Sequence, residues 1–200
     1  MAHLPITIVY RQKYIQDELN ASAETKKKIF DACAGDILKA VDSIIKAYNN
    51  KKKVLFCGNG GSAADSQHLA TELVVRMSKP DRRALAAIAL TTDSSNITAA
   101  GNDIGFENVF ARQVEALGDA GDILIAISTS GKSENVNRAI TQAKKNGMTV
   151  IGFLGKDGGK SKEMVDIPIV IPSNDTQRIQ EGHITVGHIL CGIIENEMFS

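Results

Sequence analysis

The 200-residue sequence has no tryptophan, only 4% aromatic residues, and no net charge, because 23 lysines and arginines balance 23 aspartates and glutamates. Without an excess of positive charge, no long-range field attracts nucleic acid or acidic lipid, and so few aromatic residues give no stacking surface for single-stranded bases. No apolar run reaches the roughly 18 residues that span a bilayer. We therefore expect a cytoplasmic protein with neither a nucleic-acid nor a membrane partner. An anionic small ligand is still compatible, because backbone amides and helix N-termini bind anions without net charge.

Cysteine is also scarce. Cys33, Cys57 and Cys191 are odd in number and widely spaced, which fits neither a disulfide framework nor a Cys-x-x-Cys metal site. We expect three reduced and mostly buried thiols. A chain of this length matches one domain, whose core needs no disulfide or structural metal. We therefore expect a single domain over residues 1–200.

Short apolar runs alternate with segments of helical periodicity. The runs are 54–57, 86–90, 123–127, 149–154 and 167–171, and the helical segments lie near 62–78, 105–117, 132–146 and 176–198. This alternation is typical of βαβ units and predicts an α/β fold with a five-stranded parallel sheet.

The region before the first predicted strand has a helical pattern of its own. Apolar residues recur at spacings of three and four over residues 24–50, which predicts a helix with a continuous apolar face. We interpret residues 1–50 as N-terminal helices added to the sheet domain. Their apolar face requires a partner, either the sheet or a second subunit.

Ligands of open parallel sheets bind beyond the carboxyl ends of the strands. The first run is followed there by a glycine-rich segment, Gly58–Asp65, whose adjacent glycines let the backbone approach a ligand before a helix N-terminus. The spacing of Gly58, Gly60 and Ala63 formally satisfies the dinucleotide fingerprint. A dinucleotide site also requires an acidic residue at the end of the second strand. Here that strand is predicted to end at residue 90, and the first acidic residue after it is Asp93. Dinucleotide binding and a tight turn without a ligand are the alternatives to a site for another anion.

The third run is followed by a hydroxyl-rich segment. Its hydroxyl residues are Ser128, Thr129, Ser130 and Ser133. With exposed amides and a helix N-terminus they form a donor-rich cradle for a phosphate monoester. The alternative is a helix N-cap, but a cap needs only one hydroxyl, so we favour phosphate.

A second glycine-rich segment, Gly155–Ser161, is similar to the Walker A phosphate loop. It has only three residues between the first glycine and the Gly-Lys-Ser triplet, one fewer than that loop requires. We interpret it as a turn.

Two of the predicted helices carry residues that bind metals. His68 and Glu72 lie four apart, and thus on one face of their helix, while Gln180 and His188 lie eight apart and can border one groove. A single His-x-x-x-Glu pair is usually a solvated helix pair, but both helices adjoin the ligand-binding edge. Imidazole and carboxylate ligands suit zinc, with related divalent ions as competitors. Glu72 and His188 are also candidates for proton transfer. We expect His183 at a helix surface or an interface.

From about residue 25 to residue 198 the chain resembles the sugar isomerase (SIS) domain family, and within it most closely the sedoheptulose 7-phosphate isomerases, or phosphoheptose isomerases. The resemblance is carried by the motifs CGNGGSAADSQH at 57–68, GND at 101–103, ISTSGKS at 127–133 and RIQEGH at 178–183, with His188 following. Several motifs in the same order are far more specific than any one of them.

This resemblance implies a three-layer αβα sandwich with a five-stranded parallel sheet and N-terminal helices. It also implies an aldose–ketose isomerase that converts D-sedoheptulose 7-phosphate to D-glycero-D-manno-heptose 7-phosphate through an enediol, the first step of bacterial heptose biosynthesis. One zinc ion per subunit would be held by His68, Glu72, Gln180 and His188, and Glu72 and His188 would move protons between C1 and C2. The substrate would be bound by Asn59, Gly60, Gly61, Glu72, Asn102, Asp103, Ser128, Thr129, Ser130, Ser133 and Gln180.

The resemblance further implies a homotetramer with active sites between subunits, which would cover the N-terminal helices. An alternative from another class is a non-catalytic SIS-domain protein that binds the replication initiator or senses a phosphosugar. Relatives that bind the initiator commonly lack the second histidine of the last helix, so the presence of His188 favours the enzyme.

Overall fold

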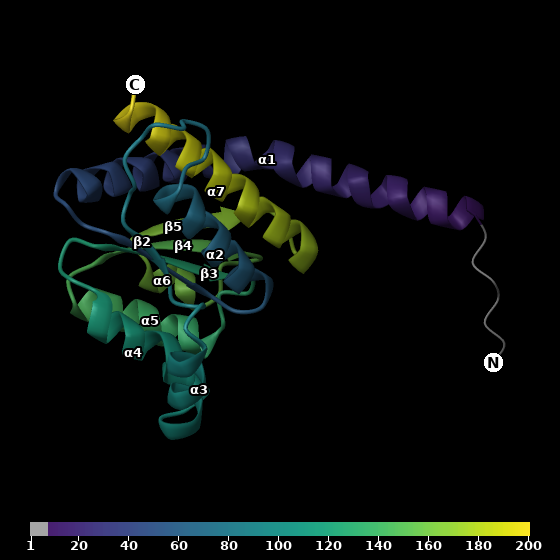
Figure 1. Cartoon of the computed structure of the whole chain (residues 1–200). Coiled ribbons are helices and arrows are strands. Elements are labelled where there is room, and N and C mark those ends of the chain that lie inside the picture. The colour runs from purple at the N-terminus through teal and green to yellow at the C-terminus, as the bar shows by residue number, and fades with distance from the viewer. Residues whose placement is uncertain (1–7) are drawn as a thin grey trace.

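A five-stranded parallel sheet forms the centre of the computed structural model, which describes residues 8–200 (Figure 1). The strands are β1 (Val54–Gly58), β2 (Ala87–Ala89), β3 (Ile123–Ser128), β4 (Thr149–Gly155) and β5 (Ile167–Ile171). Their order across the sheet is β2-β1-β3-β4-β5, and every neighbouring pair is parallel. The predicted α/β class and the five predicted strands are thus confirmed.

The sheet is buried on both faces, so its strands are continuous apolar runs. One face packs on α1 (Ile8–Asn49), α2 (Gly61–Val74) and α7 (Thr176–Met198). The other face packs on α4 (Val109–Leu117) and α5 (Glu134–Lys145). Alternate residues of each strand therefore enter two separate cores, as Phe56 and Leu55 do on β1. Figure 1 shows the resulting three layers, with α1, α2 and α7 above the sheet and α4 and α5 below it.

Four elements differ from the prediction. The N-terminal region has one continuous helix, α1, where several were expected, and residues 1–7 of that region lie outside the described part. The helix α3 (Ser94–Asp103) was not predicted, because none of its residues is buried and it therefore has no apolar period. The predicted helix over 105–117 is divided into a short 3-10 helix, η1 (Phe106–Asn108), and α4. The turn after β4 is followed by a single helical turn, α6 (Ser161–Met164).

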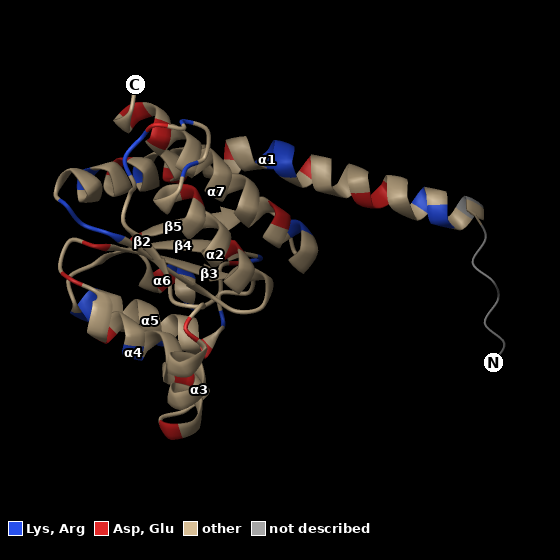
Figure 2. Cartoon of the chain, in the orientation of Figure 1, with Lys and Arg blue, Asp and Glu red and all other residues tan. Residues whose placement is uncertain are grey.

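The helix α1 covers the sheet with only its second half. Residues such as Ile37 and Ile44 are buried in the core, whereas the first half extends away from the body of the molecule (Figure 1). There Tyr14, Ile15 and Leu19 are more than half exposed, and charges of both signs lie along the helix (Figure 2). None of the described helices has the length and apolar character to cross a membrane.

The three cysteines and His183 are all buried in the folded chain. Cys33, Cys57 and Cys191 are free and buried, as predicted. The expectation of a surface or interface position for His183 is wrong, because its side chain is 0% exposed and its Nε2 lies 2.9 Å from the carbonyl oxygen of Leu154. Burial lowers the pKa of His183 from 6.5 to about 4, although the bond to that carbonyl raises it.

We predict that the chain loses stability as the pH falls below about 6.5. The folded chain resists a proton on His183 that the unfolded chain accepts, so this contribution is complete above pH 6.5 and is lost as the pH falls toward 4. The loss should reach on the order of 2 kcal/mol by pH 5. Urea unfolding at pH 7 and pH 5 would measure it. His183→Gln retains an N–H donor but cannot titrate, so it should lose less stability over this range; an equal loss in both proteins would contradict the prediction.

Candidate active site

The glycine-rich segment turns the chain sharply from β1 into α2. Gly60 has a φ of 56°, and a Cβ at Gly58 would lie 2.7 Å from the Cβ of Ser62. Between them, Asn59 exchanges two side-chain hydrogen bonds of 2.8 Å with Asn135 at the start of α5. The turn therefore exposes the N-terminus of α2 at the carboxyl edge of the sheet and is attached to the N-terminus of α5.

The hydroxyl-rich segment, residues 128–133, lies at the same edge, between β3 and α5, and is called the serine loop below. Ser133 is the N-cap residue of α5, but its hydroxyl makes no capping hydrogen bond and lies 3.2 Å from the hydroxyl of Ser128. Ser128 accepts a bond of 3.1 Å from the amide of Gly131, and Ser130 accepts one of 3.3 Å from the amide of Lys132. The hydroxyls are thus gathered around the loop rather than used to cap the helix, which supports the anion cradle over the N-cap alternative.

The turn that resembles a Walker A loop packs directly against the hydroxyl-rich segment. Ser161 at its end is fully buried, and its hydroxyl oxygen lies 2.9 Å from the carbonyl oxygen of Gly131 and 2.6 Å from the side-chain oxygen of Asn137. The amide of Ser161 also donates to Gly131, at 3.0 Å. Gly131 has a φ of 61°, and a Cβ there would overlap the carbonyl group of Gly158. The two loops therefore fit together only with glycine at 131.

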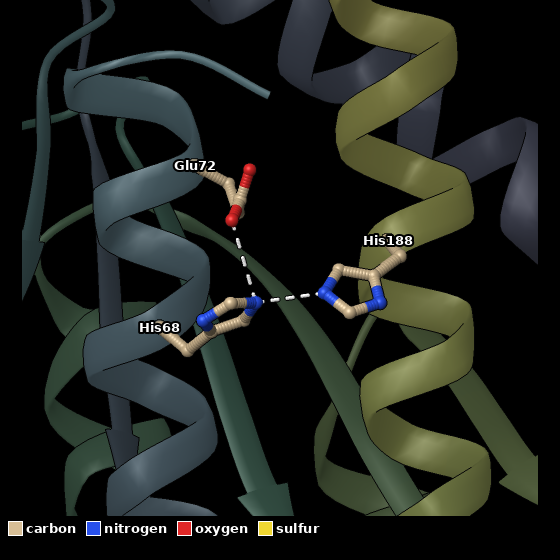
Figure 3. Close-up of side chains that lie close together, drawn as sticks. All are labelled: His68, Glu72 and His188. Carbon is tan, nitrogen blue, oxygen red and sulfur yellow. Dashed lines mark hydrogen bonds and ion pairs between the residues drawn. The ribbon is translucent and has the colours of Figure 1, made fainter. Parts of the chain in front are cut away.

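Three predicted metal ligands converge from α2 and α7. The Nε2 atoms of His68 and His188 lie 2.7 Å apart, and His68 Nε2 lies 3.4 Å from Glu72 Oε1 (Figure 3). The candidate ligand atoms of all three residues lie within 4.8 Å of one another. No other group of three or more His, Cys, Asp or Glu residues in the described chain converges in this way.

The donor set of this cluster fits a zinc ion. Two imidazole nitrogens at hydrogen-bond distance can share only one proton when both rings are neutral, and their lone pairs otherwise point at the same small space beside a carboxylate. Two histidines and one glutamate form a catalytic type of zinc site, in which further positions stay open to other ligands. The side chains of His68, Glu72 and His188 could thus hold such an ion.

Gln180 lies two turns before His188 on α7, next to Gly61 and Asp65. A Cβ at Gly61 would overlap the Gln180 amide. Burial raises the pKa of Asp65 to about 6, while its hydrogen bond with Gln180 and the nearby His68 lower it. The structure therefore places Gln180 against the start of α2, whereas His68 and Glu72 lie about two and three turns further along that helix.

Asn102 and Asp103 lie at the end of α3, directly before η1 and α4 in the chain. Asn102 donates a hydrogen bond of 2.7 Å to Asp103, and both side chains are exposed. Apart from this bond to each other, neither makes a hydrogen bond or ion pair with a predicted site residue among residues 8–200 of one chain. One chain thus unites the serine loop with Asn59 and the histidines with Glu72, but leaves these two residues apart.

Sequence reasoning missed a buried ion pair between α7 and the segment that follows α2. Glu195 on α7 and Arg82 lie 2.6 Å apart, and their side chains are 2% and 1% exposed. Burial alone would raise the pKa of Glu195, but hydrogen bonds from Ser78, Arg82 and backbone amides hold that pKa well below its usual range. A charged residue at an apolar position of the last helix, seven after His188, was the available signal.

Known proteins are similar to this chain in sequence and structure over most of its length. Residues 19–155 match the SIS domain family. The chain is 52% identical to a phosphoheptose isomerase of Clostridium acetobutylicum over 94% of its own length and 96% of the relative's, and 55% identical to one of Nitratiruptor sp. over 92% and 97%. The solved phosphoheptose isomerase of Neisseria gonorrhoeae superimposes with a TM-score of 0.88 at 41% identity, over 92% of this chain and 98% of that one.

We predict that Gly131→Ala disrupts the serine loop. The substitution combines a left-handed backbone with an overlap against Gly158, so it should lower the free energy of unfolding by roughly 2 to 5 kcal/mol. Gly35→Ala is the matched control, because it lies within α1 with open space around it and should stabilise the chain by about 1 kcal/mol. Urea unfolding of both variants would measure the difference. Equal stability of Gly131→Ala and the wild type would show that the two loops can separate.

Proposed function

Because the chain belongs to the SIS domain family and, within it, to the phosphoheptose isomerases, we infer that it is an aldose–ketose isomerase that converts D-sedoheptulose 7-phosphate to D-glycero-D-manno-heptose 7-phosphate. The observation that carries this function at the level of atoms is the convergence of His68 and Glu72 from α2 with His188 from α7 (Figure 3). A module that only binds phosphosugars or another protein would need the serine loop but not this cluster. The enzymatic reading is therefore favoured over the non-catalytic alternative.

Glu72 and His188 are the proposed proton-transfer groups. Isomerisation removes a proton from the carbon beside a carbonyl and returns it to the neighbouring carbon, so a carboxylate and an imidazole close to both carbons can exchange it through an enediol. Oε1 of Glu72 faces His68, and a carboxylate has a second oxygen able to carry a proton. One side chain can thus serve both as ligand and as base.

His68, Glu72, Gln180 and His188 are the proposed ligands of one zinc ion per subunit. When bound, zinc supplies Lewis-acid polarisation of the sugar oxygens between which charge moves in the reaction. Gln180 lies beside Asp65 rather than within the group of Figure 3, so ligation by all four residues requires its amide to turn along α7.

The remaining substrate contacts are proposed from the geometry of the loops. The hydroxyls of Ser128, Thr129, Ser130 and Ser133, together with the N-terminal amides of α5, would bind the phosphate. Asn59, Gly60, Gly61, Asn102 and Asp103 would contact the sugar. Phosphate binding at the far end of the substrate would supply the energy that orients C1 and C2 toward Glu72 and His188.

We also propose a homotetramer in the cytoplasm, with active sites between subunits and no nucleic-acid or membrane partner. The support is the set of exposed apolar residues along α1, of which Phe30 is 76% exposed and Leu19 is 62% exposed. An apolar helix face of this kind is stabilised by burial against a second copy.

The function is tested by a coupled assay on metal-replete protein, which follows the appearance of an aldoheptose phosphate from sedoheptulose 7-phosphate. Turnover should disappear with a chelator and return with zinc. His188→Ala should lower kcat by at least about 100-fold, because it removes a proton-transfer group, while phosphosugar binding persists. Saturable phosphosugar binding without turnover in the replete wild type would instead favour the non-catalytic alternative, and full turnover in His188→Ala would remove His188 from the mechanism.

The assembly is tested by light scattering. We expect a particle of four times the 21.4 kDa of one chain, and Phe30→Asp should reduce this mass because it places a charge on an exposed apolar position. Asp31→Ala, at the exposed neighbouring position of α1, is the control and should leave the mass unchanged. A monomeric wild type would contradict the proposed assembly.

A further inference from the structure

The carboxylate of Glu195 is surrounded by donors from the segment that follows α2. Backbone amides of Met77, Ser78 and Lys79 donate to it at 2.9, 2.7 and 3.0 Å, and the Ser78 hydroxyl donates at 2.6 Å. Arg82 completes the set through its Nε, at 2.6 Å. So many donors fix one position of the segment relative to α7.

Arg82 has a second contact, with the backbone of a proposed catalytic residue. Its Nη2 donates a hydrogen bond of 2.6 Å to the carbonyl oxygen of Glu72. Glu72 lies in the last turn of α2, where carbonyl groups lack partners within the helix and a cation is favourable. Arg82 therefore fixes the backbone from which the Glu72 side chain extends.

The same ion pair reaches the helix that carries His188. Glu195 lies two turns after His188 on α7, about 10 Å along the helix axis. On the other side of His188, Gly187 allows a close approach, because a Cβ there would lie 2.5 Å from a methyl carbon of Leu69 on α2. The two helices are thus held together at the histidines, by the contact of Gly187 with Leu69, and again about two turns further along α7, by the ion pair.

We propose that Arg82 and Glu195 are positioning residues for the cluster of His68, Glu72 and His188. Their buried ion pair holds the last turn of α2 at the distance from α7 that metal ligation and proton transfer require. This inference rests on the proposed function of the cluster. Groups that orient metal ligands typically account for 10- to 100-fold in metal affinity or activity.

Arg82→Lys and Glu195→Gln test the inference in the full chain. Lysine retains the charge opposite Glu195 but cannot reach Glu195 and the Glu72 carbonyl with one rigid fork. Zinc affinity, measured by competition with a chromogenic chelator, should fall roughly 10- to 100-fold in both variants. The kcat should fall with it, while the KM for sedoheptulose 7-phosphate changes little because the serine loop is untouched.

A loss of stability alone must be separated from a loss of positioning, because removing one partner of a buried ion pair is also destabilising. Asp122→Asn is the matched control. Asp122 is a buried carboxylate that accepts hydrogen bonds from the amides of Lys53 and Asp119 and pairs with the Lys53 ammonium at 2.6 Å, but these partners lie on neither α2 nor α7 nor the segment between α2 and β2. The Asp122→Asn substitution should therefore lower the midpoint of thermal unfolding and leave zinc affinity unchanged.

Ser78→Ala is the milder variant if the ion-pair variants do not fold, since it removes one hydrogen bond to Glu195 and should weaken zinc binding roughly 2- to 10-fold. The inference would be overturned, and the proposed function left intact, if Arg82→Lys and Glu195→Gln bound zinc as tightly as the wild type does. The same holds for Ser78→Ala when it is the variant tested. An equal loss in Asp122→Asn would also overturn the inference. A wild type that binds no zinc would overturn the metal site itself, and this inference with it.

Discussion

The close approach of α2 and α7 is the constraint on which the rest of the site depends. Gly187 gives α7 room to lie against Leu69, and this contact places a histidine from each helix within 2.7 Å of the other. Neither helix holds a site alone, because one offers His68 and Glu72 and the other offers His188. The chemistry therefore exists only in the folded chain, and it depends on a contact without polar atoms.

The parallel sheet supplies the other half of the site through its topology. Strands β1 and β3 are neighbours in the sheet although some 65 residues separate them in the sequence, so the loops that follow them lie at one edge. The paired amides of Asn59 and Asn135 join these loops. Because each loop leads directly into a helix, two helix N-termini are directed at the same region. This arrangement suits a substrate with an anionic end and a reacting end.

The elements that could be predicted from the sequence are those whose position follows from a local pattern of apolar residues. All five strands were found because both sheet faces are buried, and α7 was found to its last residue because its apolar period is regular. The sequence could not reveal α3, which has no fully buried residue in this chain, or the burial of His183, since a histidine in a helix has no pattern that separates surface from core. Glu195 was missed because its partners lie more than 110 residues earlier in the sequence. The surroundings of His183 and Glu195 were thus set by contacts with residues distant in the sequence.

Two exposed segments have a common explanation in the proposed assembly. The first half of α1 presents Tyr14, Ile15 and Leu19 to solvent, and α3 has no buried residue although it carries Asn102 and Asp103. Isolated helices are marginal in water, and most helical stability in proteins comes from packing. Within one chain, Asn102 and Asp103 lie apart from the other predicted site residues. A second subunit that packed on α3 would stabilise this helix and would place Asn102 and Asp103 at the substrate of that subunit. The segments that stabilise the assembly would then also complete the site.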